Sequence, residues 1–167
     1  MNTANAAILI VAYKSRESLP QVIEALGCQS LRPARVRVLE NGSPDGERVQ
    51  ESDFPDWVDF VESEDNLGFA AGNNLLARGI EEDWLICLNP DAFPDADWLE
   101  QLMSAVQTYP DIDLFGSTQR AHGQEGVLDG VGDVYHFTGQ AYRAGYGKTI
   151  MVPEDGEVFA PCVLPPQ

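Results

Sequence analysis

The 167-residue chain is poor in cysteine and in basic residues, and it lacks a long apolar run. Its 3 cysteines, Cys28, Cys87 and Cys162, are odd in number and widely separated, which predicts reduced thiols in a cytoplasmic protein. The longest apolar stretch, residues 6–13, is far shorter than the roughly 20 residues of a membrane-spanning helix. No basic region precedes this stretch and no cleavage-site pattern follows it, so we expect no signal peptide.

Charge is strongly one-sided. The chain has 10 Lys and Arg against 27 Asp and Glu, for a formal net charge of −17. This balance excludes binding to nucleic acid, which draws its affinity from basic side chains. Residues 49–119 contain 16 acidic residues and one basic residue, Arg78. We expect most of these carboxylates to form a solvated face, whereas an anionic ligand would need a divalent metal held by a few of them.

The length predicts one domain over residues 1–167. Residues 6–12 form a continuous apolar run, as expected of a central strand buried on both faces of a parallel sheet. Strands and helices then alternate, which predicts an α/β fold with a Rossmann-like, doubly wound, mainly parallel sheet and helices on both faces. Further strands are expected at residues 36–40, 58–62, 84–88 and 114–116, and helices at residues 69–78 and 97–109.

A first helix is expected directly after Ser18. Ser18 and Gln21 have the spacing of a capping box, Pro20 falls in the first turn, and a stripe of apolar residues follows at helical spacing. Pro33 is expected to end the connection from this helix to the next strand.

The pattern becomes irregular from about residue 117, where residues 134–137 form the only convincing strand. His122 and His136 have no partners at metal-ligand spacing, and we expect a structural role for both. Cys87 lies inside an apolar strand and is expected in the core.

Polar residues follow four of the expected strands. Because ligands bind beyond the carboxyl ends of strands in open parallel sheets, these residues predict one polar crevice. Each segment by itself is also a common turn or strand stop. The segments are residues 13–15, 40–43, 65–68 and 89–91.

Four motifs in this order resemble the successive signatures of family 2 glycosyltransferases. They are residues 10–13 (Ile-Val-Ala-Tyr), 39–43 (Leu-Glu-Asn-Gly-Ser), 66–74 (Asn-Leu-Gly-Phe-Ala-Ala-Gly-Asn-Asn) and 88–91 (Leu-Asn-Pro-Asp). The third motif is the most distinctive, and the match covers nearly the whole chain. It is particularly similar to the branch that includes rhamnosyltransferases and related enzymes of cell-surface polysaccharide assembly.

The resemblance implies a GT-A fold and inverting transfer of a hexosyl or rhamnosyl group from a dTDP-, UDP- or GDP-linked sugar. Glu40 stands where the family usually has an Asp that hydrogen-bonds the base, and its extra methylene leaves the base open. Tyr13 would pack near the base or ribose, or be a buried tyrosine at a strand end. The nucleotide-sugar-binding residues implied are Ala12, Tyr13, Glu40, Asn41, Gly42, Asn66, Gly68, Asn73, Asn74 and Asn89.

Residues 89–91 look like a variant of the family's Asp-x-Asp motif. The resemblance therefore implies that Asp91 binds Mg²⁺ or Mn²⁺ and that Asn89 faces the ribose. A hard cation there would neutralise charge that develops on the diphosphate leaving group. The alternative is a plain strand stop, because proline cannot continue a central ladder.

Family members continue past the equivalent of residues 159–162 to a helix and an acidic pair that supplies the general base. Inverting transfer needs this base to take the proton of the acceptor hydroxyl. We therefore expect a chain truncated at its C-terminus, with Asp129, Asp133 and Glu157 as poor substitutes. The alternative is a catalytically inactive nucleotide-sugar-binding remnant, which would bind the donor without transferring it.

An unrelated doubly wound nucleotide-binding or receiver domain is a weaker hypothesis, because residues 114–117 offer no lysine at the end of the fifth strand. The partners implied by the glycosyltransferase resemblance are a nucleoside-diphosphate sugar and a glycan or lipid-linked acceptor. We also expect peripheral membrane association and, through apolar surface left uncovered, a homodimer.

Overall fold

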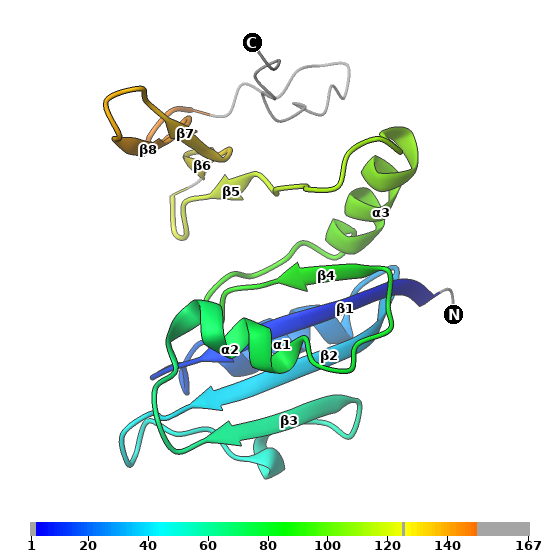
Figure 1. Ribbon diagram of the computed structural model, residues 1–167, viewed down its shortest axis with the longest axis vertical. Helices are drawn as coiled ribbons and strands as arrows, with labels where there is room; N and C mark the ends of the chain where they lie inside the picture. Colours follow the sequence, from blue (N-terminus) through cyan, green and yellow to red (C-terminus); the bar gives the residue numbers. More distant parts are fainter. Residues whose placement is uncertain (1–2, 125, 150–167) are drawn as a thin grey trace. The chain divides into compact units, whose positions relative to one another are not determined.

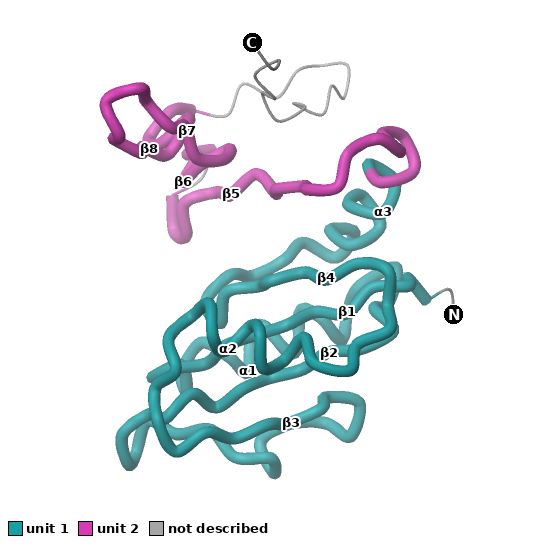
Figure 2. Tube along the Cα trace, in the orientation of Figure 1, with its two compact units in different colours: residues 1–105 teal, residues 106–167 magenta. Residues whose placement is uncertain are grey.

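The computed structural model describes residues 3–124 and 126–149. It divides into two compact units, residues 1–105 and 106–167 (Figure 2). The single domain expected over residues 1–167 stays a prediction. The elements are β1 (Thr3–Ala12), α1 (Leu19–Gly27), β2 (Arg32–Asn41), the 3₁₀ turn η1 (Glu51–Asp53), β3 (Val58–Ser63), α2 (Gly68–Leu76), β4 (Trp84–Cys87), α3 (Trp98–Thr108), β5 (Gln119–Arg120), β6 (Leu128–Gly130), β7 (Asp133–Tyr135) and β8 (Ala141–Arg143) (Figure 1).

The first unit is built on a parallel sheet with the strand order β3-β2-β1-β4. All three strand pairs are parallel, which confirms the predicted α/β architecture. β1 is an inner strand, and residues 6–12 are all buried, as expected of a strand covered on both faces.

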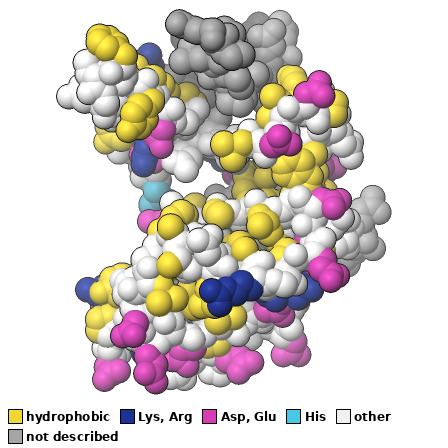
Figure 3. Space-filling model, viewed as in Figure 1, with side chains coloured by type: hydrophobic (Ala, Val, Ile, Leu, Met, Phe, Trp, Pro, Cys, Tyr) yellow, Lys and Arg dark blue, Asp and Glu magenta, His cyan; other side chains and the backbone are white. Residues whose placement is uncertain are grey.

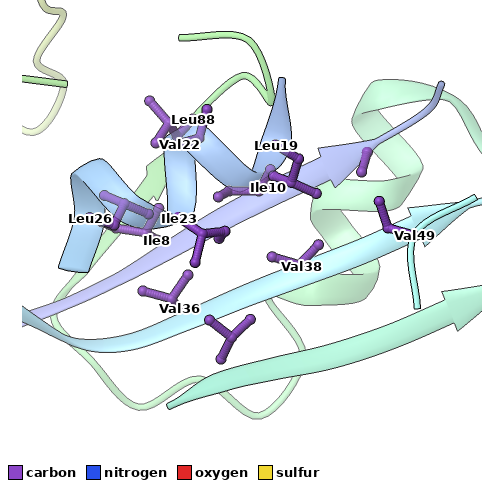
Figure 4. Close-up of a cluster of buried hydrophobic side chains, with 12 residues drawn as sticks. Ile8, Ile10, Leu19, Val22, Ile23, Leu26, Val36, Val38, Val49 and Leu88 are labelled. Atoms are coloured by element: carbon purple, nitrogen blue, oxygen red, sulfur yellow. The ribbon is translucent and has the colours of Figure 1, made fainter. Parts of the chain in front are cut away.

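Helix α1 covers one face of this sheet through the predicted apolar stripe. Leu19, Val22, Ile23 and Leu26 are all buried, and they pack against side chains of β1 and β2 such as Ile10 (Figure 4). The start of α3 adds Leu99, which is fully buried in a cluster with residues 4 and 6 of β1.

Helix α2 covers the opposite face, where it packs through Leu76 against Leu9, Val11 and Leu39. A Cβ atom on Gly72 would lie 2.9 Å and 3.0 Å from the two methyl groups of Val11. The helix can approach the sheet this closely only because position 72 has no side chain. Helices on both faces confirm the doubly wound arrangement.

The capping box predicted at Ser18 is wrong. Ser18 has helical backbone angles, φ −90° and ψ −37°, and makes no side-chain cap hydrogen bond. Its hydroxyl donates instead to the carbonyl of Ser15 at 3.5 Å, and the same carbonyl accepts the amide of Leu19 at 2.9 Å. The preceding turn already has helical geometry, so Ser18 cannot adopt the extended conformation of a capping residue.

Two further predictions about strands are wrong. Pro33 does not end the connection but lies inside β2, which starts at Arg32. Pro33 pairs with Ala4 of β1, and pairing with β3 begins only at Val36. Its missing N–H therefore costs the sheet no hydrogen bond. The strand expected at residues 114–116 does not form, and Leu114 is 83% exposed, because so short a segment needs a neighbouring strand to pair with.

Strand β4 lies at the edge of the sheet, and its residues alternate in exposure. Leu85 and Cys87 pair with Ala7 and Leu9 and so point to the face that carries α2. Both are exposed, because α2 packs over β1 and β2. The prediction that Cys87 lies in the core is therefore wrong.

Acidic side chains gather along the end of the first unit that carries β3 (Figure 3). Every Asp and Glu from residue 51 to residue 65 is exposed, which confirms a solvated acidic face in this segment. Among the described residues, no helix is long and apolar enough to cross a membrane.

The second unit contains two small antiparallel pairs, β5 with β6 and β7 with β8. β7 confirms only the first half of the strand expected at residues 134–137, because it ends at Tyr135, whereas its partner β8 and the β5–β6 pair were not foreseen. Asp129 forms an ion pair with Arg143, and His136 contacts the hydroxyl of Thr138 at 2.9 Å. Glu157 and the expected chain-end features at residues 159–167 lie outside the described residues.

Candidate functional site

The parallel pairing brings the carboxyl ends of four strands to one edge of the sheet. The β1–β2 register ends at Ala12 and Glu40, and the β2–β3 register ends at Asn41 and Ser63. β4 reaches the level of Leu9 and then continues into residues 88–91. The predicted convergence of four polar loops is present, because parallel strands share their direction.

The side-chain amides of Asn41 and Asn66 join the loops that follow β2 and β3 through hydrogen bonds. The side-chain N–H of Asn41 donates to Oδ1 of Asn66 at 3.1 Å, and Oδ1 of Asn41 accepts the backbone N–H of Leu67 at 3.0 Å. Oδ1 of Asn66 also accepts the N–H of Gly68 at 2.8 Å. Asn41 is only 2% exposed, so its amide serves mainly to hold the third motif against the second.

Gly42 makes this close approach possible. Its φ is +69°, and a Cβ atom there would lie 2.4 Å from the carbonyl carbon of Asp65 and 2.5 Å from the amide nitrogen of Asn66. Both neighbours are backbone atoms, which cannot rotate away. Only glycine fits at this position.

Glu40 is 1% exposed, and both of its carboxylate oxygens are used inside the protein. Oε1 accepts the backbone N–H of Ser43 at 2.7 Å, and Oε2 accepts that of Val49 at 3.0 Å. The carboxylate thus holds the loop of residues 43–49 in place. Its contact with a nucleobase stays a prediction, but the loop-holding role was missed, although an acidic residue directly before a turn is a usable signal for it.

Arg48 also ties this loop to β3 and was not singled out from the sequence. Its Nε donates to the carbonyl of Ser43 at 2.9 Å, and a guanidinium nitrogen lies 3.0 Å from Oε1 of Glu62. The loop after β2 is therefore held by Glu40 at the end of β2 and by the contact of Arg48 with β3.

The loop after β1 is joined to the loop after β2. The backbone N–H of Lys14 donates to the hydroxyl of Ser43 at 2.9 Å, and the hydroxyl of Ser15 donates to the carbonyl of Tyr13 at 3.1 Å. Tyr13 is 41% exposed, so it is not a buried tyrosine at a strand end. Ala12 is fully buried and offers a ligand no side-chain surface.

Two neighbouring asparagines of α2 differ in accessibility. Asn73 is 8% exposed, and its side-chain N–H donates to the carbonyl of Phe69 at 2.9 Å, while its Oδ1 has no hydrogen-bond partner. Asn74 is exposed. Of the two, only Asn74 is accessible to solvent. Gly68 has a φ of +77° at the start of α2, a backbone conformation that glycine adopts without strain.

The fourth motif follows β4 as a tight turn in which the N–H of Ala92 donates to the carbonyl of Asn89 at 3.2 Å. Asn89 and Asp91 are both exposed. Within residues 3–124 and 126–149, no cluster of three or more Asp, Glu, His or Cys side chains surrounds a possible metal position. One accessible carboxylate nevertheless suits Mg²⁺, which is commonly held by one or two carboxylates together with water and substrate phosphates.

These features define an α/β protein of the GT-A type, in which the loops after the parallel strands gather at one edge of the sheet. The family model for glycosyl transferase family 2 matches residues 7–151. The chain therefore belongs to glycosyl transferase family 2.

A curated relative is an "Uncharacterized glycosyltransferase" of Haemophilus influenzae, which is 26% identical over 109 residues. The aligned part covers 65% of this chain and 36% of that protein. The chain thus spans about a third of the length of the relative that it matches.

Solved structures of S. aureus TarS have a similar fold. One structure of TarS matches with a TM-score of 0.52 and 12% identity, over 76% of this chain and 24% of that one. TarS 1–349 in complex with UDP matches with a TM-score of 0.52 and 14% identity, over 74% of this chain and 40% of that one. At this identity the likeness shows the fold alone.

Proposed function

We propose that this chain forms the donor-binding part of an inverting glycosyltransferase that uses a nucleoside-diphosphate sugar and a divalent metal. The observation that supports this most directly is the hydrogen-bonded assembly of the first three motifs at the carboxyl edge of the sheet. Asn41, Gly42 and Ser43 are its centre, because they contact the loops after both β1 and β3. Membership of the family and the UDP bound by TarS support the choice of ligand.

In this proposal the exposed groups at the edge contact the ligand and the buried groups hold them in place. Tyr13, Asn74 and Asn89 face the donor, whereas Glu40 and Asn41 keep the loops in register. Asp91 would hold Mg²⁺ or Mn²⁺, and the bound cation would neutralise charge on the diphosphate. Without a cation, few basic side chains of this acidic protein would be available for that role.

We place the enzyme in the assembly of a cell-surface polysaccharide, with a hexosyl or rhamnosyl donor and a glycan or lipid-linked acceptor. Cys28 and Cys87 are both free thiols, which supports a cytoplasmic enzyme. Peripheral membrane association and a homodimer belong to the same proposal.

Calorimetric titration tests the donor site. The purified chain is titrated with UDP, dTDP and GDP, with and without Mn²⁺. We expect one nucleotide to bind in a metal-dependent manner and Asp91→Ala to abolish the dependence on metal. Asp56→Ala is the matched control, because it removes the same charge from an exposed residue before the amino end of β3.

Absence of binding to all three nucleotides by a folded wild-type chain would refute the donor site. If a nucleotide binds, incubation with the corresponding nucleotide sugars and release of free nucleotide distinguish an enzyme from an inactive binding remnant.

A further inference from the structure

Lys14 has an unusual backbone conformation for its residue type. Its φ is +54°, and among the described residues it is the one non-glycine residue with a positive φ. The left-handed region costs an ordinary side chain free energy that glycine, and to a lesser degree asparagine, avoids. Strain of this kind is concentrated at binding and catalytic sites, where the surrounding structure maintains it.

Neighbouring residues hold the strained backbone in place. The N–H of Lys14 donates to the hydroxyl of Ser43, a residue that is 4% exposed and is itself fixed through the buried carboxylate of Glu40. The direction in which the Lys14 side chain leaves the loop is therefore set by the same hydrogen bonds that assemble the donor site.

The side chain of Lys14 lies over the exposed ring of Tyr13. Its ammonium nitrogen is 5.4 Å from the ring centroid, within the range of a cation–π contact. Lys14 is exposed, and no ion pair joins it to a carboxylate in the part of the chain that the structure describes. In a chain with 27 acidic residues, a cation held by an aromatic ring rather than by a carboxylate remains available to an anion.

We propose that Lys14 is an anion-binding residue of the donor site, whose ammonium group moves from the ring of Tyr13 to the diphosphate when a nucleotide binds. The flexible four-carbon side chain permits this movement, which exposes the ring to the base or ribose. One residue thus covers an apolar surface in the free protein and neutralises charge in the complex. The inference rests on the proposed donor site and assigns a residue that the motifs by themselves did not.

The test compares a nucleoside diphosphate with its nucleoside, for example UDP with uridine, on the full chain by calorimetry. Lys14→Gln removes the charge, and Arg16→Gln is the control, because Arg16 is an exposed cation of the same loop that donates to the carbonyl of Gly46. We expect Lys14→Gln to weaken diphosphate binding about tenfold, as for loss of one hydrogen bond to a charged group. Nucleoside binding should be unchanged or tighter, and Arg16→Gln should change neither.

Lys14→Asn adds a readout that a purely structural residue would not give. Asparagine tolerates a positive φ, so this variant should raise the Tm by roughly 2–4 °C while it weakens diphosphate binding. Stability and affinity would then change in opposite directions.

The outcomes separate the two proposals. If the wild type binds no nucleotide, the donor site itself is refuted. If the wild type binds but Lys14→Gln behaves like Arg16→Gln, or weakens nucleoside and diphosphate equally, the role of Lys14 is refuted and the donor site stands.

Discussion

Replacing Gly42 by alanine should separate the loops that form the edge of the site. The new Cβ would lie 2.4 Å from the carbonyl carbon of Asp65 and 2.5 Å from the amide nitrogen of Asn66. Both atoms belong to the backbone, so the loop after β3 must move as a whole. Movement there strains or breaks the hydrogen bonds of Asn41 to Asn66 and Leu67.

Two costs contribute to the loss of stability. A left-handed backbone costs alanine about 1–2 kcal/mol relative to glycine. Loss of the partners of the buried Asn41 amide costs about 1–3 kcal/mol. We therefore expect the free energy of unfolding to fall by roughly 2–5 kcal/mol, a large part of the 5–15 kcal/mol typical of a domain.

Gly46→Ala is the matched control for the first cost alone. Gly46 has a φ of +88°, and no atom lies within 4 Å of the position of its Cβ. Urea unfolding followed by tryptophan fluorescence is a suitable assay, because Trp57, Trp84 and Trp98 all lie in the first unit. If Gly42→Ala is no more destabilising than Gly46→Ala, close approach of the two loops does not contribute and the reasoning fails.

Three further results are expected. Glu40→Gln should lower the free energy of unfolding by about 2 kcal/mol in urea titrations. The carboxylate accepts two backbone N–H groups, and in the variant the side-chain NH₂ group would face one of them, donor against donor. An unchanged urea midpoint would contradict this. Arg37→Ala should lower the free energy of unfolding by about 1–2 kcal/mol, because the guanidinium donates to the carbonyls of Leu76 and Arg78 at the end of α2. The specific readout is a loss of protection from hydrogen exchange that is confined to this end of the helix. Partial burial raises the pKa of the Cys87 thiol, so less thiolate is present at a given pH. The rate of alkylation by iodoacetamide should therefore keep rising at pH values above the usual pKa range of thiols. A rate that levels off below that range would contradict the burial effect.

The hydrophobic pattern was sufficient to predict most of the first unit. Residues 6–12 are apolar without interruption and form the doubly covered inner strand, and the stripe that begins at Leu19 forms the buried face of α1. Both patterns are local and directly reflect burial, so sequence spacing alone identifies them. The polar segments after the strands were likewise found because strand direction determines where they meet.

Predictions that depended on a partner elsewhere in the chain were less successful. The segment at residues 114–116 has the composition of a strand but no neighbouring strand, and Cys87 lies in an apolar strand whose outer face is left uncovered. Pro33 is tolerated in β2 because β3 does not reach it. Each outcome depends on which surfaces meet in the folded chain, and the local pattern of residues does not show this.

By itself, the sequence determined the order of strands and helices in the first unit, the central position of β1 and the four polar segments at the strand ends. Only the tertiary structure decided what each polar residue in those segments does. Glu40 and Asn41 look like ligand-binding groups in the sequence, but they are buried and bound to backbone amides of neighbouring loops. The sequence placed Lys14 in a polar segment at a strand end without a role of its own, and the structure shows its strained backbone and its contact with the ring of Tyr13. The physical reason is that the hydrogen bonds of Asn41 to Asn66 and of Lys14 to Ser43 join segments 25 or more residues apart, whose approach is set by packing of the whole sheet.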